Sequence, residues 1–480
     1  SYSVTGVQTC ALPISSHCYY YTLVYKNGLS KVSTDQELQE NKMKKIMILC
    51  LLLFILVGCK PQEQTEEPTP SRTYDEAELA MLEEMEASFM FFYEQANSDE
   101  TSPGYGLIND RYPSNVSLSS IASVGFGLAG LPVGIEYDWI TEEEGRVRAE
   151  KTLDTFLNMD HYHGFFYHFV EKSTGERSGN SEVSIIDTAL FIAGAITAGE
   201  YFGGAVKTKA MELYERIDWT WYLDKGRNMF YMGYRPESGF AGHWDFYGEQ
   251  LILYVLGAGA PNEDYRTDQS VYNTFIRRRA SYGGGETFIS SWFGSLFTYQ
   301  FSHAFIDFRD TEDEQGVNWF DNSVHATIAN RQYAIDMSST YQTFHANSWG
   351  MTASDGPLGY SGYYGSKPSG YTDDAHRNDG TIAPAGALGS VVFTPEFVKG
   401  AILNFETIGG LKGQYGYKDA YNFDRNPVWI AQDVIGIDKG ITLLMLANYF
   451  DEIIWEYFMQ NTAVQQGLSR IGIEKVSETN

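Results

Sequence analysis

The stretch "SIIDTALFIAGAITAGEYF", residues 184–202, decides the fold class. Its apolar residues recur at helical spacing behind a Ser and an Asp, which predicts a helix that opens near Ser184. Stretches of the same kind follow one another along the chain, among them residues 77–96, 247–260 and 438–459. Strand-like alternation is short, with possible hairpin pieces near Phe165–Phe169 and Met229–Tyr234. The sequence therefore predicts an all-α fold.

Long loops rich in Gly, Tyr, Trp and Asp separate the predicted helices. No second linker interrupts residues 76–475, so we predict a single domain over that range. Helical hairpins that alternate with such loops favour a toroid, with the loops gathered at one end and carrying the site. Composition alone does not separate this toroid from an α-solenoid.

The N-terminal region predicts export. Residues 1–42 include "SVTGVQTCALPIS", which resembles translated sequencing-adapter read-through, and we expect them to be a non-native leader. Residues 43–58 have two Lys and a short apolar run, as signal peptides do, and the run is too short to span a bilayer. The ending Leu56–Cys59 looks like a bacterial lipobox, in which Cys59 is lipidated. A plain secretory signal with an incidental Cys is the alternative.

Residues 59–75 are polar and contain Pro, as expected for a flexible tether. We therefore expect an exported protein, anchored by lipid to the bacterial membrane at the outer membrane or the periplasmic face. The membrane would be a partner only through that anchor.

Charge and cysteine content exclude several functions. The 480 residues carry a net charge of −28, which disfavours nucleic acid as a partner because phosphate contacts need clustered Lys and Arg. All the cysteines lie at or before the proposed cleavage site, at positions 10, 18, 50 and 59. The folded part can thus hold no disulfide, no thiolate nucleophile and no Cys-ligated zinc. A neutral ligand fits this composition better.

Motifs for metals and phosphates are missing from the sequence. There is no HExxH, Walker loop or GxSxG elbow. "HYHGFFYH", residues 161–168, is the densest histidine group, and we interpret it as an aromatic wall or core surface rather than a metal site. We expect no metal and no cofactor.

What remains is a set of carboxylates embedded among aromatic residues. Glu182 and Asp187 flank the start of the helix predicted at Ser184, where free backbone N–H groups bind hydroxyls or carboxylates. Glu249 follows His243 and Trp244 and precedes an apolar run. Contact with rings would raise the pKa of Glu249, as a general acid requires, whereas its helix-start position would lower it. We expect desolvation to dominate only when ligand closes the cleft.

Each of these acids also has a plain structural interpretation. Asp187 could be a buried polar residue that bonds a neighbouring helix, and Glu249 could complement a helix dipole. Asp355, Asp379 and Asp438 stand on or beside loops near helical runs, where Asp commonly caps a helix.

Aromatic residues recur beside these acids and favour a sugar site. The stretch "NSWGMTASDGPLGYSGYYG", residues 347–365, places Asp355 among Trp349, Tyr360 and two further Tyr. Sugars stack their apolar faces on rings and pair their hydroxyls with carboxylates. A neutral glucan is therefore the ligand that we predict.

Several collinear stretches, with these acids among them, resemble the glycoamylase-like family of bacterial glycoside hydrolases, which includes the endo-β-1,2-glucanases. They are "SEVSIIDTALFIAGA", "HWDFYGEQLILYVLG", "NSVHATIANRQYAI", "WGMTASDGPLGY", "DGTIAPAGALGS", "YGYKDAYN", "IGIDKGITLLMLANY" and "IWEYFM". The resemblance covers most of residues 80–475. It implies an (α/α)6 toroid and inverting hydrolysis of β-1,2-linked glucan to sophoro-oligosaccharides.

By the same resemblance, Glu249 is the expected general acid and Asp438 the expected second carboxylate, with Glu182 as the next candidate. A proton relay through a neighbouring substrate hydroxyl leaves the identity of the base open. The remaining residues are expected to bind substrate: Asp187, His243, Trp244, Arg331, Trp349, Asp355, Tyr360 and Asp379. Inversion requires about 6.5–9.5 Å between the two carboxyl groups.

Three other functions fit the same residues. A transglycosylase of the same fold would retain configuration, and a non-catalytic glycan-binding lipoprotein would need no acid. Rings and carboxylates also do not specify the linkage, so a β-1,3-glucan is a third alternative.

Overall fold

The computed structural model describes residues 72–476. The chain divides into two compact units, Ser1–Thr73 and Tyr74–Asn480, and the description below concerns the second. The predicted leader, the signal peptide, Cys59 and nearly all of the tether lie outside the described residues.

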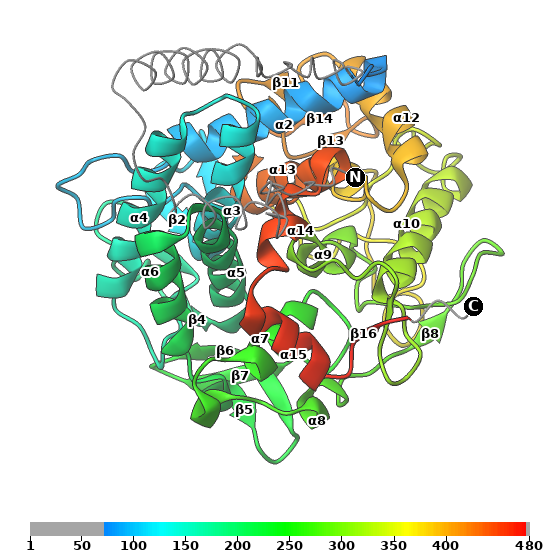
Figure 1. The fold of residues 1–480 in the computed structure, drawn as a ribbon. Coiled ribbons are helices and arrows are strands. Elements are labelled where there is room, and N and C mark those ends of the chain that lie inside the picture. The colour runs from blue at the N-terminus through cyan, green and yellow to red at the C-terminus, as the bar shows by residue number, and fades with distance from the viewer. Residues whose placement is uncertain (1–71, 477–480) are drawn as a thin grey trace, which may run out of the picture. The chain divides into compact units, whose positions relative to one another are not determined.

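Helices make up most of the regular structure (Figure 1). The α-helices are α2 (Glu76–Glu94), α3 (Ile121–Glu136), α4 (Glu142–Asn158), α5 (Ile185–Phe202), α6 (Gly204–Glu215), α7 (Leu251–Gly259), α8 (Gln269–Tyr272), α9 (Phe301–Phe305), α10 (Trp319–Asp336), α11 (Pro384–Leu388), α12 (Pro395–Glu406), α13 (Gly436–Asp451), α14 (Ile453–Phe458) and α15 (Thr462–Arg470). The 3-10 helices are η1 (Trp219–Tyr222), η2 (Glu263–Tyr265) and η3 (Leu296–Tyr299). The predicted predominance of helix is confirmed.

The strands are short and mostly paired in twos. They are β1 (Arg111–Tyr112), β2 (Leu118–Ser120), β3 (Phe169–Glu171), β4 (Val183–Ser184), β5 (Leu223–Asp224), β6 (Met229–Arg235), β7 (Gly239–His243), β8 (Arg279–Ala280), β9 (Phe288–Ile289), β10 (Thr311–Glu312), β11 (Lys412–Gly413), β12 (Gly416–Tyr417), β13 (Tyr421–Asn422), β14 (Trp429–Ile430), β15 (Val434–Ile435) and β16 (Glu474–Lys475). The hairpin predicted near Met229–Tyr234 is present as β6 and β7, with Tyr231 opposite His243. The loops thus contain more strand than an all-α fold implies.

Side-chain caps explain where several helices begin. Asp75 and Thr141 each form a capping box at the start of α2 and α4, so that two backbone N–H groups are satisfied reciprocally. Ser184 caps α5 through the backbone N–H of Asp187. The helix start predicted at Ser184 is therefore confirmed.

Helices α3 and α5 lie side by side in the core (Figure 1). They approach so closely that a Cβ added at Gly194 would lie 1.9 Å from the carbonyl oxygen of Gly125, which explains why both helices carry glycine there. Helix α5 is also the one described helix that is long and apolar enough to cross a membrane. Because 78% of its apolar window is buried inside the protein, its composition is accounted for by core packing.

Helix α13 packs against both α2 and α3 and carries a buried ion pair. The Lys439 ammonium contacts the Glu84 carboxylate, and both side chains are almost fully buried. The second Glu84 oxygen accepts the backbone N–H of Tyr417 at 2.9 Å. This ion pair fixes α13 against α2.

Breaking this pair is expected to be costly. The Lys439→Met substitution leaves the Glu84 carboxylate buried without its partner, and should lower the free energy of unfolding by about 3–5 kcal/mol. Urea denaturation would measure the change. Lys412→Met is the matched control, because Lys412 pairs with Glu83 and Glu406 at the surface and should cost less than about 1 kcal/mol. Equal losses in the two variants would contradict the prediction.

Three helices of the core begin directly after a short strand. Strand β2 leads into α3, β4 into α5 and β15 into α13. The strands belong to different small sheets, in which β2 pairs with β3, β4 with β6, and β15 with β1. Each pairing fixes the point at which the following helix starts, and so the position of its first turn.

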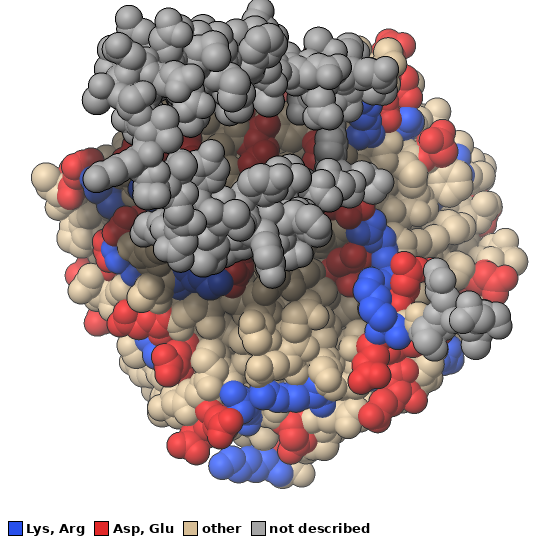
Figure 2. Space-filling model, in the orientation of Figure 1, with Lys and Arg blue, Asp and Glu red and all other residues tan. Residues whose placement is uncertain are grey.

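Charged side chains of both signs are mixed on the face shown in Figure 2, where Lys and Arg lie beside Asp and Glu. Charged side chains of the described residues also form ion pairs with one another, such as Lys209 with Glu150 and Asp154. The described part of this face therefore presents mixed charge rather than a basic patch.

Candidate active site

A cavity of about 410 Å³ opens where the core helices begin. Its walls include Ala122 of α3, Asp187 of α5 and Asp438 of α13, each in the first turn of its helix, and Glu249, two residues before α7. Backbone N–H groups in first turns have no partner within the helix, and the N-terminal end of a helix favours negative charge. The fold thus concentrates acidic side chains at one end of several helices.

Glu249 has the environment of a proton donor. Burial, and after it the negative charge of Asp187, raises the pKa of its carboxyl to about 8, against a smaller opposing effect of His168. Part of its surface nevertheless remains open to the cavity. The sequence predicts this rise only for a cleft closed by ligand, whereas in the structure burial by protein atoms alone raises the pKa of Glu249. At neutral pH Glu249 carries its proton.

His168 lies between two of the predicted acids. Its Nδ1 is 3.2 Å from a Glu182 oxygen, and its Nε2 is 3.4 Å from an Asp187 oxygen. Although burial opposes the charge, Asp187 and Glu182 raise the pKa of His168 to about 9, and hydrogen bonding to His168 lowers that of Glu182 to about 2. The interpretation of residues 161–168 as an aromatic wall or core surface therefore does not describe His168. This histidine is an imidazolium that bridges two carboxylates.

The bridge predicts a pH-dependent contribution to stability. Folding raises the pKa of His168, so its stabilisation is complete below about pH 6.5 and disappears as the pH rises through 9. The free energy of unfolding lost in His168→Gln should therefore be larger at pH 6 than at pH 9.5, by about 1–3 kcal/mol. Urea titrations at both pH values test this, with His325→Gln as the control. If the loss of unfolding free energy were the same at both pH values, His168 would not form a charged bridge between the two carboxylates.

Glu182 is ionised and firmly held rather than poised to exchange a proton. Besides His168, it accepts a hydrogen bond from Arg235 of β6 at 2.9 Å. Asp187, which lines the same cavity, accepts a hydrogen bond from the Ser184 hydroxyl. These contacts suit both carboxylates to holding hydroxyl groups.

Asp438 forms a buried carboxyl pair with Asp419. Burial raises the pKa of both carboxyl groups, that of Asp419 to about 7; the charge of Asp355 adds to the rise at Asp419, and the charge of Asp419 adds to the rise at Asp438. One oxygen of each carboxyl group is buried without a protein partner. Because two adjacent carboxylates cannot both ionise easily, the pair retains a proton near neutral pH.

Asp355 links this carboxyl pair to the guanidinium group of Arg111. Its backbone N–H donates to an Asp419 oxygen at 2.6 Å, and its carboxylate accepts from Arg111 at 3.2 Å. Arg111 also contacts Asp110 and Asp433, each at 3.4 Å. Asp355 does not line the cavity, so the structure places it behind Asp419 as a support for the acid pair.

Tyr360 lies at the wall of the cavity with 48% of its surface exposed. Crowding by protein atoms and the charges of Asp438, Asp419 and Glu249 raise its pKa well above the usual value. Its ring and its protonated hydroxyl are therefore available to a ligand next to the acids.

A second cavity of about 490 Å³ continues from the first. The two share four lining residues, which are Met232, Trp244, Glu249 and Phe297. His243 lines the second cavity, and its Nε2 lies 2.9 Å from an Asp224 oxygen. Glu249 thus stands where the two halves of one cleft meet.

Besides Asp355, three predicted site residues lie outside both cavities. Trp349 is fully buried and cannot offer a face to a sugar. Arg331 donates to the carbonyl of Ala346 at 2.9 Å and lies over the ring of Phe397. Asp379 pairs with Arg425 at 2.6 Å. Trp349 is enclosed by the core, and Arg331 and Asp379 are engaged by other protein groups, so the binding roles predicted for these three residues have no support in this geometry.

Three residues of the site were missed by sequence reasoning. They are His168, Asp419 and Arg111. Asp419 lies within "YGYKDAYN", but nothing in that stretch distinguishes it from a turn residue, and Arg111 has no recognisable motif. Their importance comes from partners that are distant in the sequence, which spacing does not reveal.

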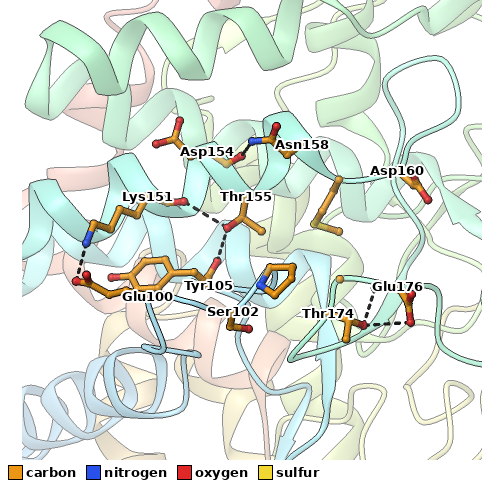
Figure 3. Close-up of a pocket in the computed structure, with 13 residues that line it drawn as sticks. Glu100, Ser102, Tyr105, Lys151, Asp154, Thr155, Asn158, Asp160, Thr174 and Glu176 are labelled. Carbon is orange, nitrogen blue, oxygen red and sulfur yellow. Dashed lines mark hydrogen bonds and ion pairs between the residues drawn. The ribbon is translucent and has the colours of Figure 1, made fainter.

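A separate surface pocket of about 520 Å³ shares no lining residue with the cleft (Figure 3). At one side Lys151 pairs with Glu100 at 2.6 Å, and Thr155 donates to the carbonyl of Tyr105. Its acids Glu100, Asp160 and Glu176 are exposed, so the pocket lacks the buried acids of the cleft. Among residues 72–476, no group of three or more His, Cys, Asp or Glu side chains is arranged to hold a metal ion.

Part of the chain matches a known protein family. Residues 242–462 match the family model Glycoamylase, described as "Putative glucoamylase". Over this range the chain is similar to that family. The matched range contains Glu249, Asp419 and Asp438, whereas His168, Glu182 and Asp187 precede it.

Relatives cover most of the chain. An exo β-1,2-glucooligosaccharide sophorohydrolase of Parabacteroides distasonis is 26% identical over 446 residues, which are 85% of this chain and 59% of that relative. The chain thus spans under two thirds of the length of this relative.

Solved structures share the fold. A "putative glucoamylase" of Bacteroides uniformis is 28% identical, with a TM-score of 0.75 over 84% of this chain and 99% of the other. An endo-β-1,2-glucanase of Chitinophaga pinensis, in complex with sophorotriose and glucose, is 25% identical, with a TM-score of 0.74 over 84% and 99% of the two chains. The glycoamylase-like resemblance found in the sequence is therefore supported along most of the described chain.

Proposed function

We propose that this protein is a glycoside hydrolase that cleaves β-1,2-linked glucan to sophoro-oligosaccharides. The observation that carries the proposal is Glu249, a carboxyl group that keeps its proton at neutral pH and stands at the junction of the two cavities. The names of the Parabacteroides and Chitinophaga relatives support the β-1,2 linkage.

In the proposed reaction Glu249 donates its proton to the glycosidic oxygen as the bond from that oxygen to the anomeric carbon breaks. A water molecule attacks the anomeric carbon from the opposite face, and its proton passes to a carboxylate. Asp438, which lines the same cavity, together with its partner Asp419 is the proposed acceptor, either directly or through a substrate hydroxyl. Attack from the opposite face inverts the configuration.

The other residues of the cleft bind the sugar. Asp187 and Glu182 are the proposed acceptors for sugar hydroxyl groups, and His168 keeps them in place. The proposed stacking rings are Trp244, which lines both cavities, and Tyr360, which lines the first. Sugar binding commonly combines such faces with a few polar groups.

A substrate panel tests the proposal. The purified domain, from about residue 60, would be incubated with linear β-1,2-, β-1,3-, β-1,4- and α-1,4-glucans, with products followed by chromatography and anomeric NMR. We expect sophoro-oligosaccharides of inverted configuration from β-1,2-glucan alone. Retained configuration or ring closure would indicate a transglycosylase. Binding without any cleavage would indicate a glycan-binding protein and overturn the proposal.

We further propose that the helices of residues 76–475 form a single (α/α)6 toroidal catalytic domain. Supporting this, α3 packs against both α5 and α13, so an early and a late helix of the chain are neighbours. The similarity to glucoamylase-like structures points the same way. An experimental structure of the domain would test the ring arrangement.

The proposal for location rests on the sequence of residues 43–59. We propose that the protein is exported and anchored to the bacterial membrane through lipid on Cys59. Labelled palmitate should be incorporated into the full chain and not into the Cys59→Ser variant. Incorporation into neither protein would contradict the anchor.

A further inference from the structure

Three aromatic rings form a cluster at the outer part of the second cavity. Phe246, Trp292 and Tyr371 all line that cavity, and their ring centroids lie 5.2–5.4 Å apart with steep edge-to-face angles. Phe246 is buried, whereas Trp292 and Tyr371 are 40% and 57% exposed. The cluster therefore has a buried base and two rings presented to solvent.

The backbone holds these exposed rings in place. The loop that carries Tyr371 is tied to the segment of Trp292 by a hydrogen bond from the Gly370 N–H to the Ser291 carbonyl, at 3.1 Å. An ion pair between Arg278 and Asp373 fixes the same loop. Rings anchored in this way bind a partner with little further loss of conformational entropy.

The cluster is continuous with the proposed reaction centre. Trp244 and Glu249 belong to both cavities, and Trp292 and Tyr371 belong only to the second. The second cavity contains no carboxylate pair or imidazolium bridge of the kind found in the first, and its walls are largely aromatic. A chain that reaches Glu249 from this side would pass the cluster first.

We infer that Trp292 and Tyr371 form a distal subsite that stacks a glucosyl unit away from the cleaved bond and so favours long glucan chains. This inference rests on the proposed function, since it assigns the occupant as a further unit of the same glucan. The apolar faces of a pyranose ring match exposed, preformed aromatic faces, and the pockets that bind small organic ligands combine such faces with few polar groups.

Chain-length kinetics test the inference. The ratio of kcat/KM for linear β-1,2-glucan to kcat/KM for sophorotriose should fall about tenfold in Trp292→Ala, mainly through KM for the long substrate. Trp292→Phe retains a ring and should recover most of the ratio. Trp429→Ala is the matched control, because Trp429 lies on β14 and lines neither cavity. It should leave the ratio within twofold of wild type.

A binding measurement separates this inference from the proposed function. Calorimetry with sophoro-oligosaccharides of increasing length would compare Glu249→Gln with Glu249→Gln/Trp292→Ala. A loss of affinity confined to the longer oligosaccharides supports the distal subsite, even if the wild type cleaves no glucan and the proposed hydrolysis fails. Equal affinities at every length, or an equal loss at every length, would overturn the subsite while leaving hydrolysis intact.

Discussion

The Glu249→Gln variant should lose a factor of about 10²–10⁴ in kcat on β-1,2-glucan, the usual contribution of a positioned general acid. The amide keeps the shape of the side chain but cannot supply a proton to the leaving oxygen. Affinity for the glucan should change little, because Gln removes no buried partner from the cleft. Steady-state kinetics and calorimetry would measure the two effects separately.

The pH profile gives an independent check on the same residue. Burial raises the pKa of Glu249 to about 8, so the wild type should keep its protonated acid up to that pH and lose kcat/KM above it. The residual activity of Glu249→Gln should lack this alkaline limb. Glu396→Gln, an exposed glutamate in the first turn of α12, is the control and should keep full activity and the limb. Activity of Glu249→Gln within tenfold of wild type would exclude it as the acid.

The Asp438→Asn variant should lower kcat by about 10²-fold or more, while the free energy of unfolding stays equal or rises. The activity falls because the buried pair can no longer accept the proton of water. Stability is maintained because an amide next to Asp419 removes the repulsion between two buried carboxyl groups. Few substitutions of a buried charged residue combine these two results.

Thermal unfolding and initial rates on the same preparations would test this combination. Asp451→Asn, at the other end of α13, is the matched control and should change neither quantity appreciably. Asp419→Asn separates the roles within the pair. If Asp419 only supports Asp438, the Asp419→Asn variant should lower kcat less than Asp438→Asn does. If Asp438→Asn unfolds the protein or leaves kcat unchanged, the pair is structural.

Residues whose role depends on local structure could be predicted from the sequence. Asp187, Glu249 and Asp438 stand at helix starts, and caps and apolar runs mark helix starts within a few residues. Trp349 and Arg331 were misplaced because burial depends on which distant segments pack over a loop. The stretch around Asp355 looked like part of a sugar-binding surface, yet its carboxylate turns to Arg111, 244 positions away.

The pKa values of the site residues depend on pairs of charged groups that come from separate segments of the chain. The sequence alone does not show which groups form these pairs. His168 is close to Glu182 in the chain, but its second contact is made across the start of α5. Asp419 meets Asp438 only because both segments pack at the start of α13. The resemblance to known hydrolases suggested the acids, while the direction of the pKa shifts of Glu182, Glu249 and Asp438 follows from their partners in the structure.

The antiparallel pairing of β1 with β15 has a consequence for biosynthesis. Arg111 lies opposite Ile435, so the strand that leads into α13 pairs with a segment made more than three hundred residues earlier. Contacts between such distant segments form late and slowly, because a large loop must close first. The carboxyl pair of Asp419 and Asp438 therefore comes together only after the ribosome has added almost the whole polypeptide, and a prematurely terminated product carries Glu249 without its counterpart.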